Sequence, residues 1–233
     1  PISAALLQMD GFLGLGGWQW MFLLEGLPAC MLGVVCLTML ADTPTGATWL
    51  TTAEREALVR ELASETHERP KKDLLSALKD IRVVTLTGIT FAFTIGSYGV
   101  GIWLPLILKG HALTTMQVGW VSSIPYLFAT AGMLFWARVV DRTGAKIFNL
   151  MAALTLGAAG LALSILFTSL IPALVCLTLA LVGTISARTV FFTIPQSFLT
   201  GAAAAGGLAF INSVGAFGGF VGPYLVGLLK DAT

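Results

Sequence analysis

The sequence predicts an all-α membrane protein, and three observations support this fold class. The chain of 233 residues is 56% hydrophobic and only 11% charged, and its mean hydropathy is +0.88, whereas soluble domains carry about 25% charged residues. The charges are clustered, so that four long segments carry none: 83–108, 112–137, 147–187 and 189–229. These segments show no alternation of apolar and polar residues, which argues against membrane-spanning strands.

The uncharged segments divide into membrane spans by length. A bilayer-spanning helix needs about 20 predominantly apolar residues. Each of the two shorter segments therefore holds one helix, and each of the two longer ones must be divided, at 168–172 and at 195–201. With an earlier apolar stretch, six spans are predicted, at about 19–41, 82–108, 116–137, 147–167, 173–194 and 203–229. Residues 1–17 are expected to be the tail of an earlier helix and a short loop.

The strongly polar segment 42–80 is predicted to be a loop that contains two amphipathic helices. Thr51 or Thr52 can cap the first helix, whose body is 54–65 and which Pro70 ends. Its narrow apolar stripe, Leu58 and Leu62, predicts a helix that lies along the membrane surface. Residues 71–80 predict a second short helix that leads into the next span.

Basic residues predict the orientation in the bilayer. Two lie on one side, Lys109 and Lys230. Ten lie on the other: Arg55, Arg60, Arg69, Lys71, Lys72, Lys79, Arg82, Arg138, Arg142 and Lys146. Because basic residues are enriched in cytoplasmic loops, segment 42–80 is predicted to be cytoplasmic.

The side chains that usually carry catalysis or bind metals are sparse. The three cysteines all fall in apolar spans, and the two histidines lie in loops far from any of them. No metal-ligand spacing and no clustered nucleophile–base pair is present in the sequence. We therefore expect no catalytic residue, no metal site and no cofactor, and an enzyme is the less favoured class.

The sixth span is rich in small residues. Gly215 and Gly219 form one GxxxG pair, and Gly218 and Gly222 form another. Such pairs let helix backbones approach closely in lipid, so tight helix packing is predicted here. Alternatively, Gly222 and Pro223 form a hinge used in gating, since proline removes a backbone hydrogen bond.

The segment Arg138-Val-Val-Asp141-Arg142-Thr-Gly144-Ala-Lys146 carries a specific charge pattern. It resembles the RxxDRxGx[RK] loop that the major facilitator superfamily repeats in each half of its twelve-helix fold. A carboxylate at a helix end can pair with arginine and with the N-terminus of the neighbouring helix. The resemblance implies that Arg138, Asp141 and Arg142 act in gating; the alternative is a basic anchor alone. The family pattern usually opens with glycine where Ala137 stands.

Further motifs are similar to the anion:cation symporter branch of that superfamily, closest to tartrate-type permeases. They are Gly17-Trp-Gln-Trp20, Glu25-Gly-Leu-Pro28, Trp49-Leu-Thr-Thr-Ala-Glu-Arg55, Trp103-Leu-Pro105, Ile124-Pro-Tyr126, Phe192-Thr-Ile-Pro195, Ile211-Asn-Ser213 and Gly218-Gly-Phe-Val-Gly-Pro-Tyr224. The resemblance implies that the chain begins at the end of the fifth helix and stops after the eleventh. Residues 1–41 would then be the end of an N-half helix and the last N-half span, 42–80 the central loop, and 81–233 a C-terminal bundle of five spans.

The implied function is proton-coupled uptake of a small organic anion by alternating access. Tartrate, a related sugar acid or an aromatic carboxylate would be the substrate, and the location would be the bacterial inner membrane. The expected partners are this anion, the lipid bilayer and the missing N-terminal half, with the proton as coupling ion and no nucleic acid. The alternatives are a sugar or drug carrier of the same superfamily and, with less support, a membrane enzyme or sensor.

Polar residues within spans are the candidate substrate contacts, because burying them without partners is unfavourable. The resemblance places Asn212 in the eleventh helix, facing the cavity; an interhelical hydrogen bond is the alternative. Thr189 and Phe192 are three residues apart and share a helix face, although the family often has tryptophan where Phe192 stands. Tyr98 is expected to place its hydroxyl in the cavity, unless it serves in aromatic packing.

Two charged residues within spans have opposite interpretations. Arg188 is predicted to bind the anion, because an arginine at mid-span costs about 2.5–3.5 kcal/mol and its guanidinium can pair with a carboxylate in a bidentate fashion. The alternative is that Arg188 snorkels to the lipid headgroups. Glu25 is predicted to have a structural hydrogen-bonding role rather than a role in proton coupling.

The third span carries further candidates for substrate contact, which are Ser122, Ser123 and Tyr126.

Overall fold

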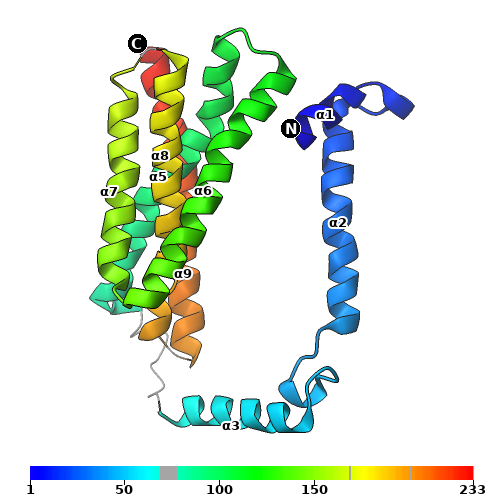
Figure 1. The fold of residues 1–233 in the computed structure, drawn as a ribbon, viewed down its shortest axis with the longest axis vertical. Coiled ribbons are helices and arrows are strands. Elements are labelled where there is room, and N and C mark those ends of the chain that lie inside the picture. The colour runs from blue at the N-terminus through cyan, green and yellow to red at the C-terminus, as the bar shows by residue number, and fades with distance from the viewer. Residues whose placement is uncertain (69–77, 168, 200, 233) are drawn as a thin grey trace. The chain divides into compact units, whose positions relative to one another are not determined.

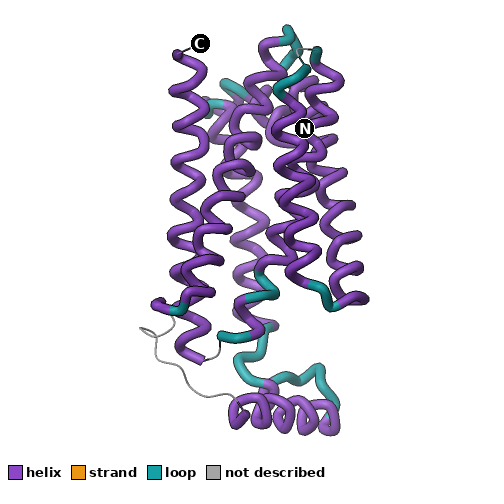
Figure 2. Tube along the Cα trace, turned by 90° about the vertical axis from the view of Figure 1, so that its left-hand side faces the viewer, coloured by secondary structure: helices purple, strands orange, loops and turns teal. Residues whose placement is uncertain are grey.

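The structure of the chain, a computed structural model, describes residues 1–68, 78–167, 169–199 and 201–232. Within these residues the regular secondary structure is helical throughout, as Figures 1 and 2 show. The chain forms two compact units, Pro1–Pro70 and Lys71–Thr233.

The first unit contains three α-helices, α1 (Ile2–Leu6), α2 (Gly17–Met39) and α3 (Thr52–Glu68), with 3-10 turns at Leu7–Met9, Phe12–Gly14 and Pro44–Gly46. Side chains satisfy the free N–H groups at the start of α2. The Asp10 carboxylate accepts a hydrogen bond from the Gly17 N–H at 2.8 Å, and Gln19 Oε1 accepts from the Gly16 N–H at 2.7 Å. Helix α2 confirms the first predicted span.

Helix α3 begins with a capping box formed by Thr51, one of the two predicted caps, and Glu54. Thr51 donates to the Glu54 carboxylate from its hydroxyl at 2.6 Å and from its backbone N–H at 3.0 Å. These hydrogen bonds lower the pKa of Glu54 below its ordinary value. Leu58 and Leu62 are exposed, as expected for the apolar stripe of a surface helix. Pro70 and most of the second predicted amphipathic helix, 71–80, lie outside the described residues.

The predicted orientation can be tested on α3, where Ala63 is exposed. In the full-length protein without its native cysteines, Ala63→Cys is expected to resist impermeant thiol reagents added to whole cells. The reason is the concentration of basic residues on this side of the bilayer. The matched control is His111→Cys. In the predicted topology this position lies on the other side of the bilayer, so its thiol should react. Labelling of the thiol at position 63 by a reagent added outside the cells would contradict the predicted orientation.

The second unit is a helical bundle in which consecutive helices run in opposite directions. Its members are α5 (Ile81–Gly110), α6 (Thr115–Thr143), α7 (Lys146–Ser164), α8 (Leu170–Phe191) and α9 (Gly201–Ala232), with a 3-10 turn at Pro195–Ser197 between α8 and α9 (Figure 1). Together with α2, these helices give six in the described part of the chain that are long and apolar enough to cross a membrane. This result confirms the six predicted spans.

Two predicted turns are wrong in their limits. Residues 138–146 were predicted as a charged turn, but α6 continues to Thr143 and ends at Gly144, whose φ of +65° suits glycine. The length of the apolar stretch shows how much of the helix lies in lipid, but not where the helix ends. The helix can continue into water, where its residues are charged. The turn predicted at 168–172 comes too late, since Pro172 lies in the first turn of α8, where proline is tolerated.

Glycines bring pairs of helices into close contact. A Cβ atom added to Gly218 or Gly222 of α9 would lie 2.5 Å from the carbonyl oxygen of Phe91 or Ile95 of α5. The tight packing predicted for the sixth span is thus confirmed. A second close contact joins α7 to α8, where a Cβ on Gly183 would lie 2.6 Å from the Ala153 carbonyl oxygen. The sequence interpretation missed this contact, although Gly157 and Gly160 of α7 were a visible signal.

Candidate functional site

One face of α8 carries two of the predicted substrate contacts, Thr189 and Phe192. Thr178, Ile185, Thr189 and Phe192 follow one another at spacings of seven, four and three residues, so they form one line along the helix. Gly183 packs on α7, on a different side of α8. The line therefore lies on another side of α8 from α7; its residues are half-buried, and Ile185 and Phe192 pack against hydrophobic core clusters.

The threonine hydroxyl groups on this line already donate hydrogen bonds to their own helix. Thr178 Oγ1 donates to the Leu174 carbonyl at 2.7 Å, and Thr189 Oγ1 donates to the Ile185 carbonyl at 3.2 Å. On α6, Ser123 Oγ and Thr130 Oγ1 likewise donate to carbonyls four residues earlier, at 2.8 and 2.9 Å. A hydroxyl bonded in this way keeps its lone pairs for an incoming donor. These four groups therefore act as hydrogen-bond acceptors.

Arg188 borders the same face and is exposed. The α-helix α8 ends at Phe191, so Arg188 lies in its last turn, although the membrane span that contains α8 continues to Ser197. A cation is favourable at a helix C-terminus, which lowers the cost of placing it there. Within the described residues the side chain of Arg188 makes no hydrogen bond or ion pair. Its guanidinium is thus available for an anion.

Thr189 and Phe192 have mixed roles. Both are half-buried, and Phe192 packs against the hydrophobic cluster that contains Phe191 and Val190. The rings of Phe191 and Phe192 meet edge to face, with centroids 5.4 Å apart. Phe192 is therefore partly a core residue, and the portion that it exposes is smaller than the sequence suggested.

Tyr98 of α5 lies against the side of α9 that carries Asn212. The ring of Tyr98, a residue of α5, lies against Gly219, where an added Cβ would meet Tyr98 Cδ1 at 3.3 Å. Asn212 and Gly219 are seven residues apart on α9, and hence on the same side of the helix. Asn212 Nδ2 donates to the Leu208 carbonyl of its own helix at 3.0 Å. This bond lies within one helix, in contrast to the interhelical bond that was the alternative, and it leaves Oδ1 as an acceptor.

The charged residues 138–146 lie at the end of the bundle where α6 ends and α7 begins. Arg138, Asp141 and Arg142 are exposed. Arg138 Nη1 donates to the Leu134 carbonyl at 3.3 Å, and Asp141 has no ion pair within the described part of the chain. The predicted pairing of Asp141 is thus not present in this structure, and the gating role remains a prediction. Helix α9 continues through Pro223 without a break, so the hinge also remains a prediction.

The sequence interpretation missed two residues of this region. Lys146 Nζ donates to the carbonyl oxygen of Thr193, just past the end of α8, at 3.3 Å. Asn149 closes the α6–α7 turn by donating from Nδ2 to the Ala145 carbonyl at 2.9 Å. Lys146 was visible as the last residue of the charge pattern, whereas nothing in the sequence singled out Asn149.

In the first unit, Glu25 has a hydrogen-bonding partner. Ser3 Oγ donates to the Glu25 carboxylate at 2.6 Å, which links α1 to α2. This contact supports the structural role predicted for Glu25.

Asp141→Asn is expected to slow transport by the full-length protein without a large change in substrate affinity. Asp141 lies at a helix end, on a different helix from Arg188 and Asn212, and the substitution removes a charge while conserving shape. Transport rate and substrate affinity, measured separately, check this expectation. Normal turnover with a strongly weakened affinity would instead assign Asp141 to the binding site.

Comparison with known proteins decides the family. The model of the Major Facilitator Superfamily matches residues 5–223, nearly the whole chain. The chain belongs to the Major Facilitator Superfamily. It is an integral membrane protein, and its family comprises transporters rather than enzymes.

Curated relatives match this superfamily member over all or nearly all of its length. A protein from Agrobacterium vitis named "Putative tartrate transporter" is 45% identical over all of this chain and 54% of its own length. The "Quinolone resistance transporter" of Acinetobacter baumannii is 39% identical over all of this chain and 55% of its own length. The "Inner membrane transport protein RhmT" of Escherichia coli K12 is 39% identical over 97% of this chain and 53% of its own length. The chain thus spans about half the length of these relatives.

Proposed function

We propose that this chain contributes the C-terminal wall of the binding site in a symporter for small hydroxy-carboxylate anions. The observation that carries the proposal is the position, near the end of α8, of the Arg188 guanidinium, which has no partner within the described residues, beside the Thr189 hydroxyl, which donates to its own helix. The similarity to a relative named a tartrate transporter, which extends over the whole chain, supports the same substrate class.

The two kinds of group on α8 match two groups of such an anion. The Arg188 guanidinium suits a carboxylate, because its planar donors can form a bidentate, charge-assisted pair. Thr189, next to Arg188, donates to its own helix and so accepts a hydrogen bond from a hydroxyl group of the substrate. Asn212 Oδ1 offers a further acceptor on α9. Tartrate and sugar acids carry both a carboxylate and hydroxyl donors.

The mechanism proposed is alternating access, with the site at the interface of two transporter halves near the middle of the membrane. A preceding half would supply the other wall of the site and the acid that couples transport to protons. No acidic residue lies between positions 81 and 140, which span α5 and most of α6. The location proposed is the bacterial inner membrane, in keeping with the name of the Escherichia coli relative.

Ligand-induced stabilisation of the purified full-length protein tests the substrate class. Tartrate at about 100 times its dissociation constant should stabilise the folded state by about 2.7 kcal/mol. Succinate carries the same two carboxylates without hydroxyl groups and is the matched control, with a smaller expected effect. Equal stabilisation by succinate would contradict the role of the hydroxyl acceptors. Stabilisation by a quinolone alone would instead favour the drug-carrier alternative.

A further inference from the structure

The short segment between α8 and α9 joins the two helices that carry Arg188 and Asn212. We name residues 193–199 the α8–α9 link. Pro195 and Leu199 of the link are buried, and Leu199 belongs to a hydrophobic core cluster. The Leu199 N–H donates to the Pro195 carbonyl at 2.9 Å. The link is thus a packed element whose position affects both helices.

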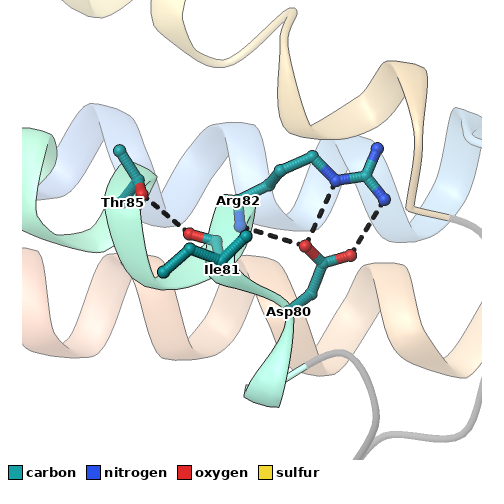
Figure 3. Close-up of polar contacts among 4 residues, drawn as sticks. All are labelled: Asp80, Ile81, Arg82 and Thr85. Atoms are coloured by element: carbon teal, nitrogen blue, oxygen red, sulfur yellow. Dashed lines mark hydrogen bonds and ion pairs between the residues drawn. The ribbon is translucent and has the colours of Figure 1, made fainter.

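Arg82, at the start of α5, contacts the link through an aromatic ring. Its guanidinium carbon lies 4.5 Å from the centroid of the Phe198 ring, within the range of a cation–π interaction. The guanidinium is oriented by Asp80, as Figure 3 shows: Arg82 Nη2 donates to Asp80 Oδ2 at 2.9 Å, and Nε donates to Oδ1 at 3.1 Å. The contact therefore has a defined geometry, although the Arg82 side chain is 56% exposed.

The same carboxylate also begins α5. Asp80 Oδ1 accepts a hydrogen bond from the Arg82 backbone N–H at 3.0 Å and so caps the helix (Figure 3). Because one side chain both caps α5 and orients the guanidinium, the direction of the Arg82 head group follows the first turn of α5. A shift of this turn would carry the head group with it.

A second cation contacts the other end of the link. Lys146 Nζ donates to the Thr193 carbonyl at 3.3 Å, and a cation is favourable at this position, just beyond the C-terminus of α8. Lys146 is the first residue of α7. The link is therefore contacted at both ends by cations from the starts of two other helices.

We propose that Arg82 is a positioning residue that couples the first turn of α5, through Phe198, to the α8–α9 link. Lys146 anchors the opposite end of the link. The consequence is that α8 and α9 keep their relative position at this end of the bundle while the Arg82–Phe198 contact is made. Loss of the contact lets the link separate from the core more often. Only the effect of this coupling on transport rests on the function proposed above.

A buried reporter thiol in the link measures this separation without any substrate. In the full-length protein without its native cysteines, Leu199→Cys places a thiol that reagents reach only when the link opens. Arg82→Lys keeps the charge but loses the planar fork, and Phe198→Leu keeps an apolar side chain but loses the ring. Each should raise the labelling rate by about 2- to 5-fold, the value of one exposed cation–π contact. Lys79→Gln, which removes a nearby exposed cation, is the control and should leave the rate unchanged.

The double variant decides whether the two residues act through one contact. In the Phe198→Leu background, Arg82→Lys should raise the rate no further, because the ring that it contacts is already gone. A parental labelling rate in Arg82→Lys, or the same increase with and without the ring, would overturn the proposal. The melting temperature of each variant identifies a fold that is merely destabilised.

Transport kinetics provide a second readout that a purely structural role would not change. Arg82→Lys should lower kcat for uptake and leave KM near the parental value, because Arg82 does not contact the substrate. An unchanged kcat would overturn the coupling to transport. If the labelling results hold but the parent takes up no hydroxy-carboxylate, the coupling through the link stands and the proposed function falls.

Discussion

Replacing Arg188 by glutamine is expected to weaken binding of a carboxylate substrate to the full-length protein by about 10- to 100-fold. A hydrogen bond to a charged group contributes about 1.5–3 kcal/mol, and glutamine removes the charge as well as the fork of donors. Arg188 lies in the last turn of α8, is exposed, and has no partner within the described residues. Equilibrium binding of the anion, or its KM for uptake, measures the effect.

Arg188→Lys separates anion recognition from snorkelling. Lysine keeps the charge and can still reach the headgroups, but it loses the planar fork. Snorkelling alone predicts nearly normal affinity for the lysine variant, whereas anion recognition predicts a clear loss. Lys109→Gln removes one positive charge from the last turn of α5 and is the control for a change in overall charge. If both Arg188 variants bind the carboxylate as well as the parent, Arg188 is not part of the site.

Gly183→Ala is expected to destabilise the bundle by about 1–3 kcal/mol, the usual cost of overpacking. The new Cβ would lie 2.6 Å from the Ala153 carbonyl oxygen of α7, and a backbone atom cannot move aside as a flexible side chain can. Helices α7 and α8 would have to separate along their shared contact. Thermal unfolding of the purified protein should show a lower transition, by on the order of 5 °C.

Gly88→Ala is the matched control for this prediction. It makes the same chemical change within a helix, but nothing lies within 4 Å of the new Cβ. Alanine has the higher helix propensity, so this variant should be as stable as the parent or slightly more stable. Equal stability of the Gly183 and Gly88 variants would show that α7 and α8 are not in such close contact.

Much of the fold could be predicted from the sequence because hydropathy reports directly on the length of each span. All six spans were found, and a cap at Thr51 or Thr52 was predicted, although the reciprocal bonds between Thr51 and Glu54 were not. The ends of the helices were harder to predict, because the bilayer sets the length of the apolar stretch but not the length of the helix. Therefore α6 extends past Arg138 and Asp141 to Thr143, and α8 ends early enough to place Arg188 in its last turn.

The candidate site was predictable in its residue types but not in its geometry. An arginine or asparagine within a span is visible in the sequence, yet its hydrogen-bond partner is set by tertiary structure. The contact of Tyr98 with Gly219 joins residues far apart in the chain, and no local pattern indicates it. The same holds for Lys146 and Thr193 and for Arg82 and Phe198. In each case the pairing depends on how the helices pack.

Proton-driven uptake of tartrate is the most direct test of the central proposal, that this chain forms one wall of a hydroxy-carboxylate symporter. The full-length protein would be reconstituted in proteoliposomes with an inwardly directed proton gradient and labelled tartrate outside. The account predicts accumulation above equilibrium, its loss on addition of a protonophore, and a strong reduction in Arg188→Gln. Failure of the folded, reconstituted parent to take up tartrate or any sugar acid under this gradient would contradict the account.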